Sequence, residues 1–265
     1  MHFLSAIRRR DDIDRPAAFP WTLPLAAGLD GIEFDAAVTF LVGENGSGKS
    51  TLLETLAVGM QAVAAGSRRL DGDPSLAPAR EFARGFRFVR RRHARTRLFL
   101  RAEDVLGFSR RISAEAEALS GIADELAEAL PEGVGRTRAV GLARAQRAAL
   151  TGRYGEDPEA RSHGETFLAL LQARLVPSGL YFLDEPETPL SPTRVLALMA
   201  ILSDRVAQGC QFVIATHSPI LMALPDAAIL VIAEGRLVPT AYDAVEHVRL
   251  TRAFLADPAR FLRAL

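Results

Sequence analysis

Residues 43–51 have the composition of a loop that surrounds phosphate groups. The segment starts with glycine, four further residues, a second glycine, lysine and serine, which is the spacing of a nucleotide-binding phosphate loop. Glycines let the backbone turn its N–H groups inward, and a following helix contributes its positive N-terminal end. We therefore expect nine residues to surround the phosphates of a nucleotide: Gly43, Glu44, Asn45, Gly46, Ser47, Gly48, Lys49, Ser50 and Thr51.

Two side chains of this loop have separate predicted tasks. Lys49 is the only lysine among 32 basic residues, and the other 31 are arginines. A lysine kept in a chain that otherwise uses arginine indicates a place where a compact ammonium is needed and a wide guanidinium does not fit. We expect Lys49 to contact the β- and γ-phosphates there. We expect the hydroxyl of Ser50 to bind Mg²⁺, because this hard cation prefers oxygen ligands.

A second candidate site lies where an apolar stretch, residues 179–183, ends in two adjacent carboxylates. Ligands of open α/β sheets bind at the carboxyl ends of the strands, where these two side chains would lie. We expect Asp184 to hold Mg²⁺ through water, and Glu185 to orient or deprotonate the water that attacks the γ-phosphate of ATP.

Together these residues resemble the ABC-type ATPase superfamily, and residues 161–165 extend the resemblance. They read Arg-Ser-His-Gly-Glu, which is similar to a variant of the family's signature motif, about twenty residues before the acidic strand end. The resemblance implies that Ser162 and the N–H of Gly164 complete the ATP site of a second protomer. Ser162 and Glu165 also have the spacing of a helix capping box, and both interpretations can hold together.

Two further segments resemble motifs of the same superfamily. Residues 215–219 read Ala-Thr-His-Ser-Pro and resemble its switch motif, which implies that His217 contacts the γ-phosphate. Residues 187–192 occupy the position of its D-loop but lack the aspartate-ending form usual in transporters. In this respect the chain looks like a soluble, non-transporter branch of these ATPases, with a signature of the Ser-His-Gly-Glu type.

Two positions of the family pattern have only loose counterparts. No glutamine stands at the Q-loop, and Glu103 lies in about the right region. The family stacks adenine on an aromatic residue before the phosphate loop. Trp21 is our candidate for this contact, with Phe19 as a second choice, although either aromatic side chain could equally belong to the core.

The elements expected around these residues alternate between strands and helices. Strands are expected at residues 38–42, 179–183 and 211–215, with helices at 50–65, 162–175 and 193–206. This order predicts an α/β fold, a P-loop NTPase with a largely parallel sheet. A hairpin at 228–239 would supply an antiparallel edge.

We expect residues 1–265 to form a single ABC-type ATPase domain with an inserted β and helical subdomain at about 82–160. In that insert, alternating apolar and arginine residues predict two mutually paired strands, 86–90 and 97–101, before an acidic helix. These elements would make up the helical insert of the predicted fold.

Composition limits the partners that are expected. The formal net charge is zero, so nucleic acid is possible but not favoured, even though residues 84–111 contain ten arginines. The N-terminus does not look like a secretory signal, and no apolar run indicates a transmembrane segment, so we predict a cytoplasmic location.

The resemblance implies Mg²⁺-dependent ATP binding and hydrolysis in a homodimer that closes head to tail around ATP. Three alternatives are open: a nucleotide-binding subunit of a transporter, a DNA-associated or defence ATPase, and a nucleotide-gated interaction module with negligible hydrolysis. A further, unknown protein partner is also possible.

Overall fold

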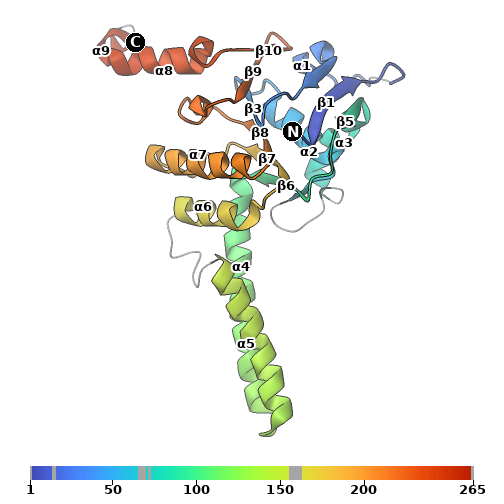
Figure 1. The fold of residues 1–265 in the computed structure, drawn as a ribbon, viewed down its shortest axis with the longest axis vertical. Coiled ribbons are helices and arrows are strands. Elements are labelled where there is room, and N and C mark those ends of the chain that lie inside the picture. The colour runs from blue at the N-terminus through green and yellow to red at the C-terminus, as the bar shows by residue number, and fades with distance from the viewer. Residues whose placement is uncertain (1, 14–15, 65–69, 71–72, 155–162, 264–265) are drawn as a thin grey trace. The chain divides into compact units, whose positions relative to one another are not determined.

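The computed structural model divides the chain into two compact units. The first consists of Met1–Ala102 with Leu175–Leu265, and the second of Glu103–Arg174. The first unit contains every described strand and the phosphate loop, whereas the second is helical (Figure 1). The residues described are 2–13, 16–64, 70, 73–154 and 163–263.

The main sheet of the first unit has seven strands. In spatial order they are β10 (Arg236–Pro239), β9 (Ala228–Ala233), β3 (Val38–Gly43), β8 (Gln211–Ala215), β7 (Gly179–Asp184), β6 (Thr96–Arg101) and β4 (Val63–Ala64). All neighbours run parallel except β10, which is antiparallel to β9. Strands β3, β7 and β8 are buried at every position, as expected for parallel strands covered on both faces. The predicted α/β fold with a largely parallel sheet and an antiparallel edge is confirmed.

A smaller antiparallel sheet has the order β2 (Gly31–Glu33), β1 (Leu4–Arg9) and β5 (Phe86–Arg90). The prediction that strands 86–90 and 97–101 pair with each other is wrong. Strand β5 pairs with β1, and β6 instead lies between β4 and β7 in the main sheet. An alternating pattern shows that a strand has one covered face, but it does not identify the neighbouring strand.

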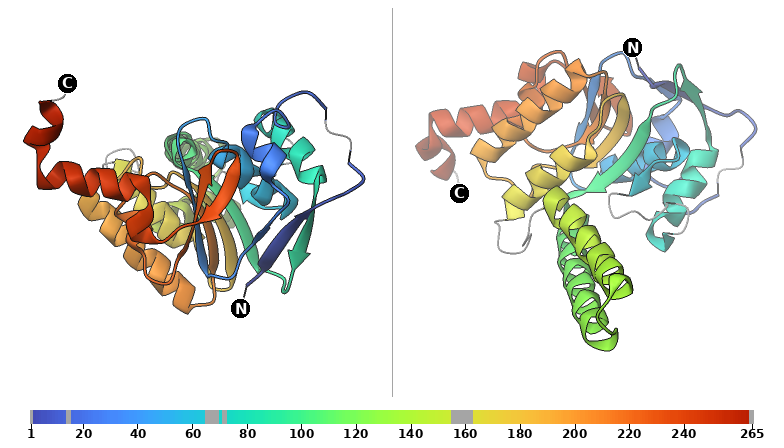
Figure 2. Two further views of the ribbon diagram at one scale, coloured as in Figure 1. Left: turned by 90° about the horizontal axis from the view of Figure 1, so that it is seen from above. Right: turned by 60° about the horizontal axis from the view of Figure 1, so that its bottom comes forward.

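Helix α2 (Lys49–Gly59) lies between the two sheets, and α7 (Pro192–Ala207) covers the opposite face of the main sheet (Figure 2). Leu52, Leu53 and Leu56 of α2 are fully buried in the core that both sheets share. Helix α2 is shorter than the predicted 50–65, because Gln61 adopts φ 55° and the chain then enters β4. Burial of this helix fixes the phosphate loop that precedes it.

The remaining helices of the first unit are short or peripheral. They are α1 (Pro24–Gly28), η2 (Pro74–Leu76), α3 (Ala77–Arg84), η3 (Leu221–Ala223), η4 (Tyr242–Ala244), α8 (Glu246–Ala256) and α9 (Pro258–Leu262). Among them, α8 reaches the candidate site, because His247 in its first turn contacts His217.

The second unit consists of α4 (Ala102–Ala129), α5 (Val134–Tyr154) and α6 (His163–Arg174). Ala123 of α4 packs with Val140 and Ala143 of α5. Strands β5 and β6, which we assigned to an insert at about 82–160, belong to the first unit, and α6 belongs to the second. No helix in the described part of the chain is long and apolar enough to cross a membrane.

Candidate active site

The phosphate loop connects the end of β3 to the start of α2. Gly46 and Gly48 have φ angles of 79° and 96°, in the left-handed region that favours glycine. Gly48 is the N-cap residue of α2, and as a glycine it has no side chain that could accept a hydrogen bond from the first turn of the helix. The first N–H groups of α2 therefore lack a side-chain cap and are available to an anion such as a phosphate.

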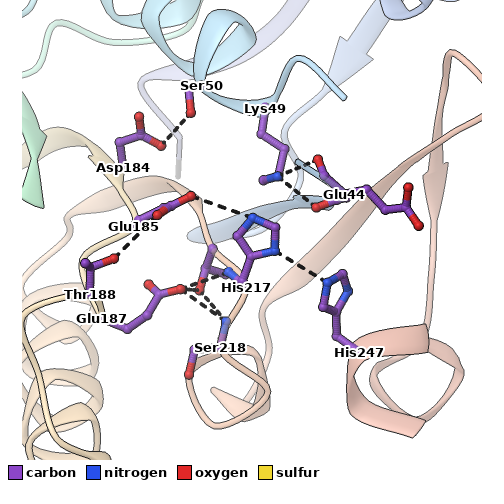
Figure 3. Close-up of polar contacts among 12 residues, drawn as sticks. Glu44, Lys49, Ser50, Asp184, Glu185, Glu187, Thr188, His217, Ser218 and His247 are labelled. Carbon is purple, nitrogen blue, oxygen red and sulfur yellow. Dashed lines mark hydrogen bonds and ion pairs between the residues drawn. The ribbon is translucent and has the colours of Figure 1, made fainter. Parts of the chain in front are cut away.

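Lys49 lies inside this loop and is only 5% exposed. Its Nζ donates hydrogen bonds to the carbonyl oxygens of Gly43, at 2.8 Å, and Glu44, at 2.9 Å (Figure 3). Burial lowers the pKa of Lys49, while Glu185 and Asp184 oppose that effect. The two carbonyl groups hold the ammonium at the loop, where a third N–H remains to meet a phosphate oxygen.

Ser50 and Asp184 form the candidate magnesium site. The Ser50 hydroxyl donates to Oδ1 of Asp184 at 3.2 Å, and Asp184 ends strand β7 with 9% exposure. Among the described residues no group of three or more His, Cys, Asp or Glu side chains is arranged to hold a metal ion. A hydroxyl and a carboxylate fit Mg²⁺ when nucleotide phosphates and water supply the remaining ligands.

Asp184 is predicted to destabilise the nucleotide-free protein at neutral pH. Burial raises its pKa to about 6 from the ordinary 3.8, so the folded state holds the proton more tightly than the unfolded state. Stability is therefore lost as pH rises from about 4 to about 6, and the penalty is fully present above that range. We expect Asp184→Asn to raise the free energy of unfolding by up to about 3 kcal/mol at pH 7.5.

Urea denaturation without nucleotide or Mg²⁺ measures this effect, and the gain should shrink as pH falls toward 4. The control Asp204→Asn removes an exposed carboxylate of α7 and should change stability by less than about 0.5 kcal/mol. A loss of stability in Asp184→Asn at pH 7.5 would contradict the prediction.

Glu185 follows Asp184 and turns out of the sheet. Its φ of 46° is unusual for a residue with a side chain, and its N–H donates to the carbonyl of Ala215 in β8 at 2.9 Å. The carboxylate is 42% exposed, with Oε1 at 3.6 Å from Nε2 of His217. The turn thus points the carboxylate toward His217 instead of continuing the strand.

The ring of His217 lies between two partners. Its Nε2 faces Glu185, and its Nδ1 is 3.4 Å from Nε2 of His247 in the first turn of α8. Burial and the nearby charge of Lys49 lower the pKa of His217, with a smaller contribution from His247. A neutral ring has one N–H donor, and a hydrogen bond from His247 to Nδ1 would leave that donor at Nε2, on the side of the carboxylate.

His247 is therefore predicted to orient the ring of His217. We expect His247→Ala to lower the rate of ATP turnover about 2- to 10-fold, the equivalent of one ordinary hydrogen bond. Steady-state kinetics measures the effect, and His247→Gln is the matched variant, because its amide N–H can replace the donor. If the Ala and Gln variants were equally impaired, or neither were impaired, the contact would have no orienting role.

The residues predicted at the signature motif and the Q-loop lie mostly outside the described part of the structure. Ser162 lies outside the described residues, as do the side chains of Glu103 and His163. Gly164 is described, and it is buried in the first turn of α6. Their predicted roles stay predictions.

The two aromatic candidates for adenine stacking lie in different surroundings. The ring of Trp21 packs edge-on against Phe82 at 4.9 Å between centroids, beside the core of the first unit. Phe19 is 55% exposed. An aromatic residue type does not separate a core contact from a base-stacking contact, so stacking by Trp21 also stays a prediction.

Three members of the arginine cluster at 84–111 make contacts within the first unit. Arg101 pairs with Glu54 at 2.6 Å, Arg90 donates to the Gly59 carbonyl, and Arg84 pairs with Glu81. Two of these contacts pair an arginine with a carboxylate, and the expectation that nucleic acid is not favoured stays a prediction.

Two residues of the site had no predicted role. Glu187 belongs to the D-loop segment, for which the sequence predicts no side-chain role, yet its Oε1 accepts hydrogen bonds from the loop that carries His217. His247 lies thirty residues beyond His217 in the sequence and belongs to no motif. The glutamate at the D-loop position was the one available signal for Glu187.

Comparison with known proteins identifies the family. The family model described as "ABC transporter" matches residues 34–188, more than half of the chain, including the phosphate loop and both carboxylates. The chain belongs to this family of ATP-binding proteins. As a member it is an ABC-type P-loop ATPase, and the predicted resemblance to the ABC-type superfamily is confirmed. The assignment to a non-transporter branch with a Ser-His-Gly-Glu signature stays a prediction. A second model, "AAA domain, putative AbiEii toxin, Type IV TA system", matches residues 166–223.

Two curated relatives are 32% and 30% identical to this ATPase over the residues that align. Both are the cytochrome c biogenesis ATP-binding export protein CcmA of Rhodopseudomonas palustris. The protein of strain BisB5 is 32% identical over 198 residues, which cover 74% of this chain and 86% of the relative. That of strain HaA2 is 30% identical over 195 residues, which cover 72% and 85%.

Solved structures share the fold at lower identity. A metal-chelate type ABC transporter in an inward-facing conformation has a TM-score of 0.51 and 16% identity, with 97% of this chain and 90% of that chain covered. A nucleotide-free ATP-binding cassette from an ABC transporter has a TM-score of 0.50 and 16% identity, with 96% of both chains covered.

Proposed function

We propose that this chain hydrolyses ATP, with Mg²⁺, in a homodimer that closes head to tail when ATP is bound. The observation that carries the proposal is the meeting of three features at one edge of the main sheet: Lys49 in its loop, the Ser50–Asp184 pair, and Glu185 facing His217. Phosphoryl transfer requires little covalent chemistry from the protein, so positioning and charge neutralisation account for most of the rate. This set of side chains supplies both.

Each side chain has one task in the proposed reaction. Lys49 and the N–H groups at the start of α2 neutralise the charge of the phosphates. Glu185 orients or deprotonates the water whose oxygen attacks the γ-phosphorus, while the bond from that phosphorus to the ADP oxygen breaks. Neutral His217 donates a hydrogen bond to the γ-phosphate. Mg²⁺ held through Ser50 and Asp184 supplies further charge neutralisation.

The proposal includes a second protomer because the signature segment precedes Asp184 by about twenty residues, as the family pattern requires. Ser162 and the N–H of Gly164 would complete the ATP site of the partner copy. The proposed organisation is therefore a single ATPase domain over residues 1–265 that acts as a pair, in the cytoplasm.

The dependence of ATPase rate on protein concentration tests this proposal. Rates per protomer that rise with concentration, and that vanish in Ser162→Arg, would support a shared site. Activity that is independent of concentration and unchanged in Ser162→Arg would leave an ATPase and remove the two-protomer mechanism. No activity at all would favour a nucleotide-gated interaction module.

A second candidate is the nucleotide-binding subunit of an exporter, and the CcmA relatives favour it specifically. The D-loop sequence and the absence of a Q-loop glutamine differ from the usual transporter pattern. Affinity purification from membranes tests this candidate. Recovery of a polytopic membrane protein that stimulates ATP turnover would support a transporter, and unchanged turnover in its presence would speak against one.

A further inference from the structure

Glu187 joins the loop that follows β7 to the loop that follows β8. Its Oε1 accepts three hydrogen bonds, from the hydroxyl of Thr216 at 2.5 Å, the N–H of His217 at 2.8 Å and the N–H of Ser218 at 3.1 Å (Figure 3). The donors belong to three consecutive residues. One carboxylate oxygen therefore fixes the backbone on both sides of the switch histidine.

The surroundings make this contact difficult to replace. Thr216 is fully buried, and its hydroxyl also accepts a hydrogen bond from the N–H of Ser218 at 3.0 Å. The second oxygen of Glu187, Oε2, is buried and has no hydrogen-bond partner among the described residues. An apolar side chain at position 187 would take this acceptor away from the N–H of His217 and from the buried hydroxyl of Thr216, which is costly in a partly buried loop.

The same short turn carries Glu187 and Glu185. The N–H of Thr188 donates to the carbonyl of Glu185 at 3.0 Å, and its hydroxyl lies 3.4 Å from Oε2 of Glu185. Glu185 faces the ring of His217, while Glu187 holds the backbone of His217. The turn after β7 thus contacts the histidine twice, once through its side chain and once through its main chain.

We propose that Glu187 is a positioning residue for ATP turnover, which sets the distance between His217 and Glu185 by holding residues 216–218 against the turn after β7. This inference rests on the proposed function, in which His217 contacts the γ-phosphate. In this role Glu187 acts through residues 216–218, to which its Oε1 is hydrogen-bonded, and not through a contact of its own with the nucleotide. Its removal should therefore lower kcat through His217 and leave the binding of ATP nearly unchanged.

A double-mutant cycle tests the proposal with Glu187→Ala, His217→Ala and the double variant. We expect kcat to fall about 10- to 100-fold in each single variant, with KM changed by less than about 3-fold, because the reacting groups are misplaced and not lost. The double variant should be no slower than the slower single variant. Glu187→Gln keeps the accepting oxygen and should recover most of the rate.

Thr216→Val removes the hydroxyl that donates to Glu187 and leaves Glu187 itself in place. It replaces Glu187→Ala in the test if that variant does not fold. We expect it to lower kcat in the wild-type background but not in the His217→Ala background. The positioning role would be overturned if the losses of kcat multiplied when His217→Ala was combined with Glu187→Ala or with Thr216→Val. Full activity of Glu187→Ala would overturn it too, and both results would leave the proposed ATPase intact. An inactive wild type, or a fully active His217→Ala, would instead overturn the proposed function together with this inference.

Discussion

Glu185→Gln is expected to lower ATP turnover by about 10²- to 10⁴-fold while ATP binding stays intact. The amide keeps the size of the carboxylate but cannot accept a proton from the attacking water. The carboxylate of Glu185 is 42% exposed, and its N–H bond to Ala215 involves only the backbone, so the substitution should leave the fold unchanged. ATP should therefore accumulate in its bound form, and a closed dimer should persist.

Single-turnover hydrolysis and size-exclusion chromatography with ATP measure the two halves of this expectation. Glu81→Gln is the matched control, because Glu81 pairs with Arg84 on the surface of α3 and should leave the rate unchanged. If Glu185→Gln turned over ATP at the wild-type rate, another group would have to act on the water.

Lys49→Ala is expected to weaken ATP binding about 10- to 100-fold, the equivalent of one charge-assisted hydrogen bond. Turnover at saturating ATP should fall by a further factor of about 10² to 10³, because the charge that develops on the γ-phosphoryl oxygens loses a partner. Nζ donates to the carbonyl oxygens of Gly43 and Glu44, so the substitution removes the cation that these two groups hold at the loop.

Titration with a fluorescent ATP analogue gives the binding constant, and thermal unfolding without nucleotide shows whether the loop still folds. Lys49→Arg separates charge from shape: we expect it to remain impaired, because a planar guanidinium does not fit between the two carbonyl groups. Arg249→Ala removes an exposed cation of α8 and should bind ATP normally. Wild-type affinity in Lys49→Ala would show that the nucleotide binds elsewhere.

Local sequence was sufficient to predict the position of a site residue where the motif and its supporting elements are adjacent in the chain. The glycines of residues 43–48 and the buried strand before them predicted strand, loop and helix, and these appear as β3, the loop and α2. The apolar run before Asp184 likewise predicted a buried strand that ends at the site. In both cases the chemistry and the element that positions it lie within about fifteen residues.

Sequence was insufficient to predict contacts between segments that are distant from each other in the chain. The sequence predicts that the arginine-rich strands β5 and β6 pair with each other, because apolar residues and arginines alternate in both. In the structure β5 pairs with β1, and β6 pairs with β4 and β7. The hydrogen bonds of Glu187 to residues 216–218, and the contact of His247 with His217, depend on parallel strands that bring separate loops together. Neither residue type nor spacing contains that information.

The central claim, that each ATP site is shared between two copies of the chain, is tested most directly by mixing two inactive variants. Lys49→Ala lacks a working phosphate loop but keeps Ser162, and Ser162→Arg lacks the signature serine but keeps Lys49. In a head-to-tail pair of the two, one site combines the intact loop of one copy with the intact signature of the other. We predict that the mixture regains roughly a quarter of the wild-type rate, because half of the dimers formed contain one intact site of two. A mixture as inactive as its components would contradict the shared site.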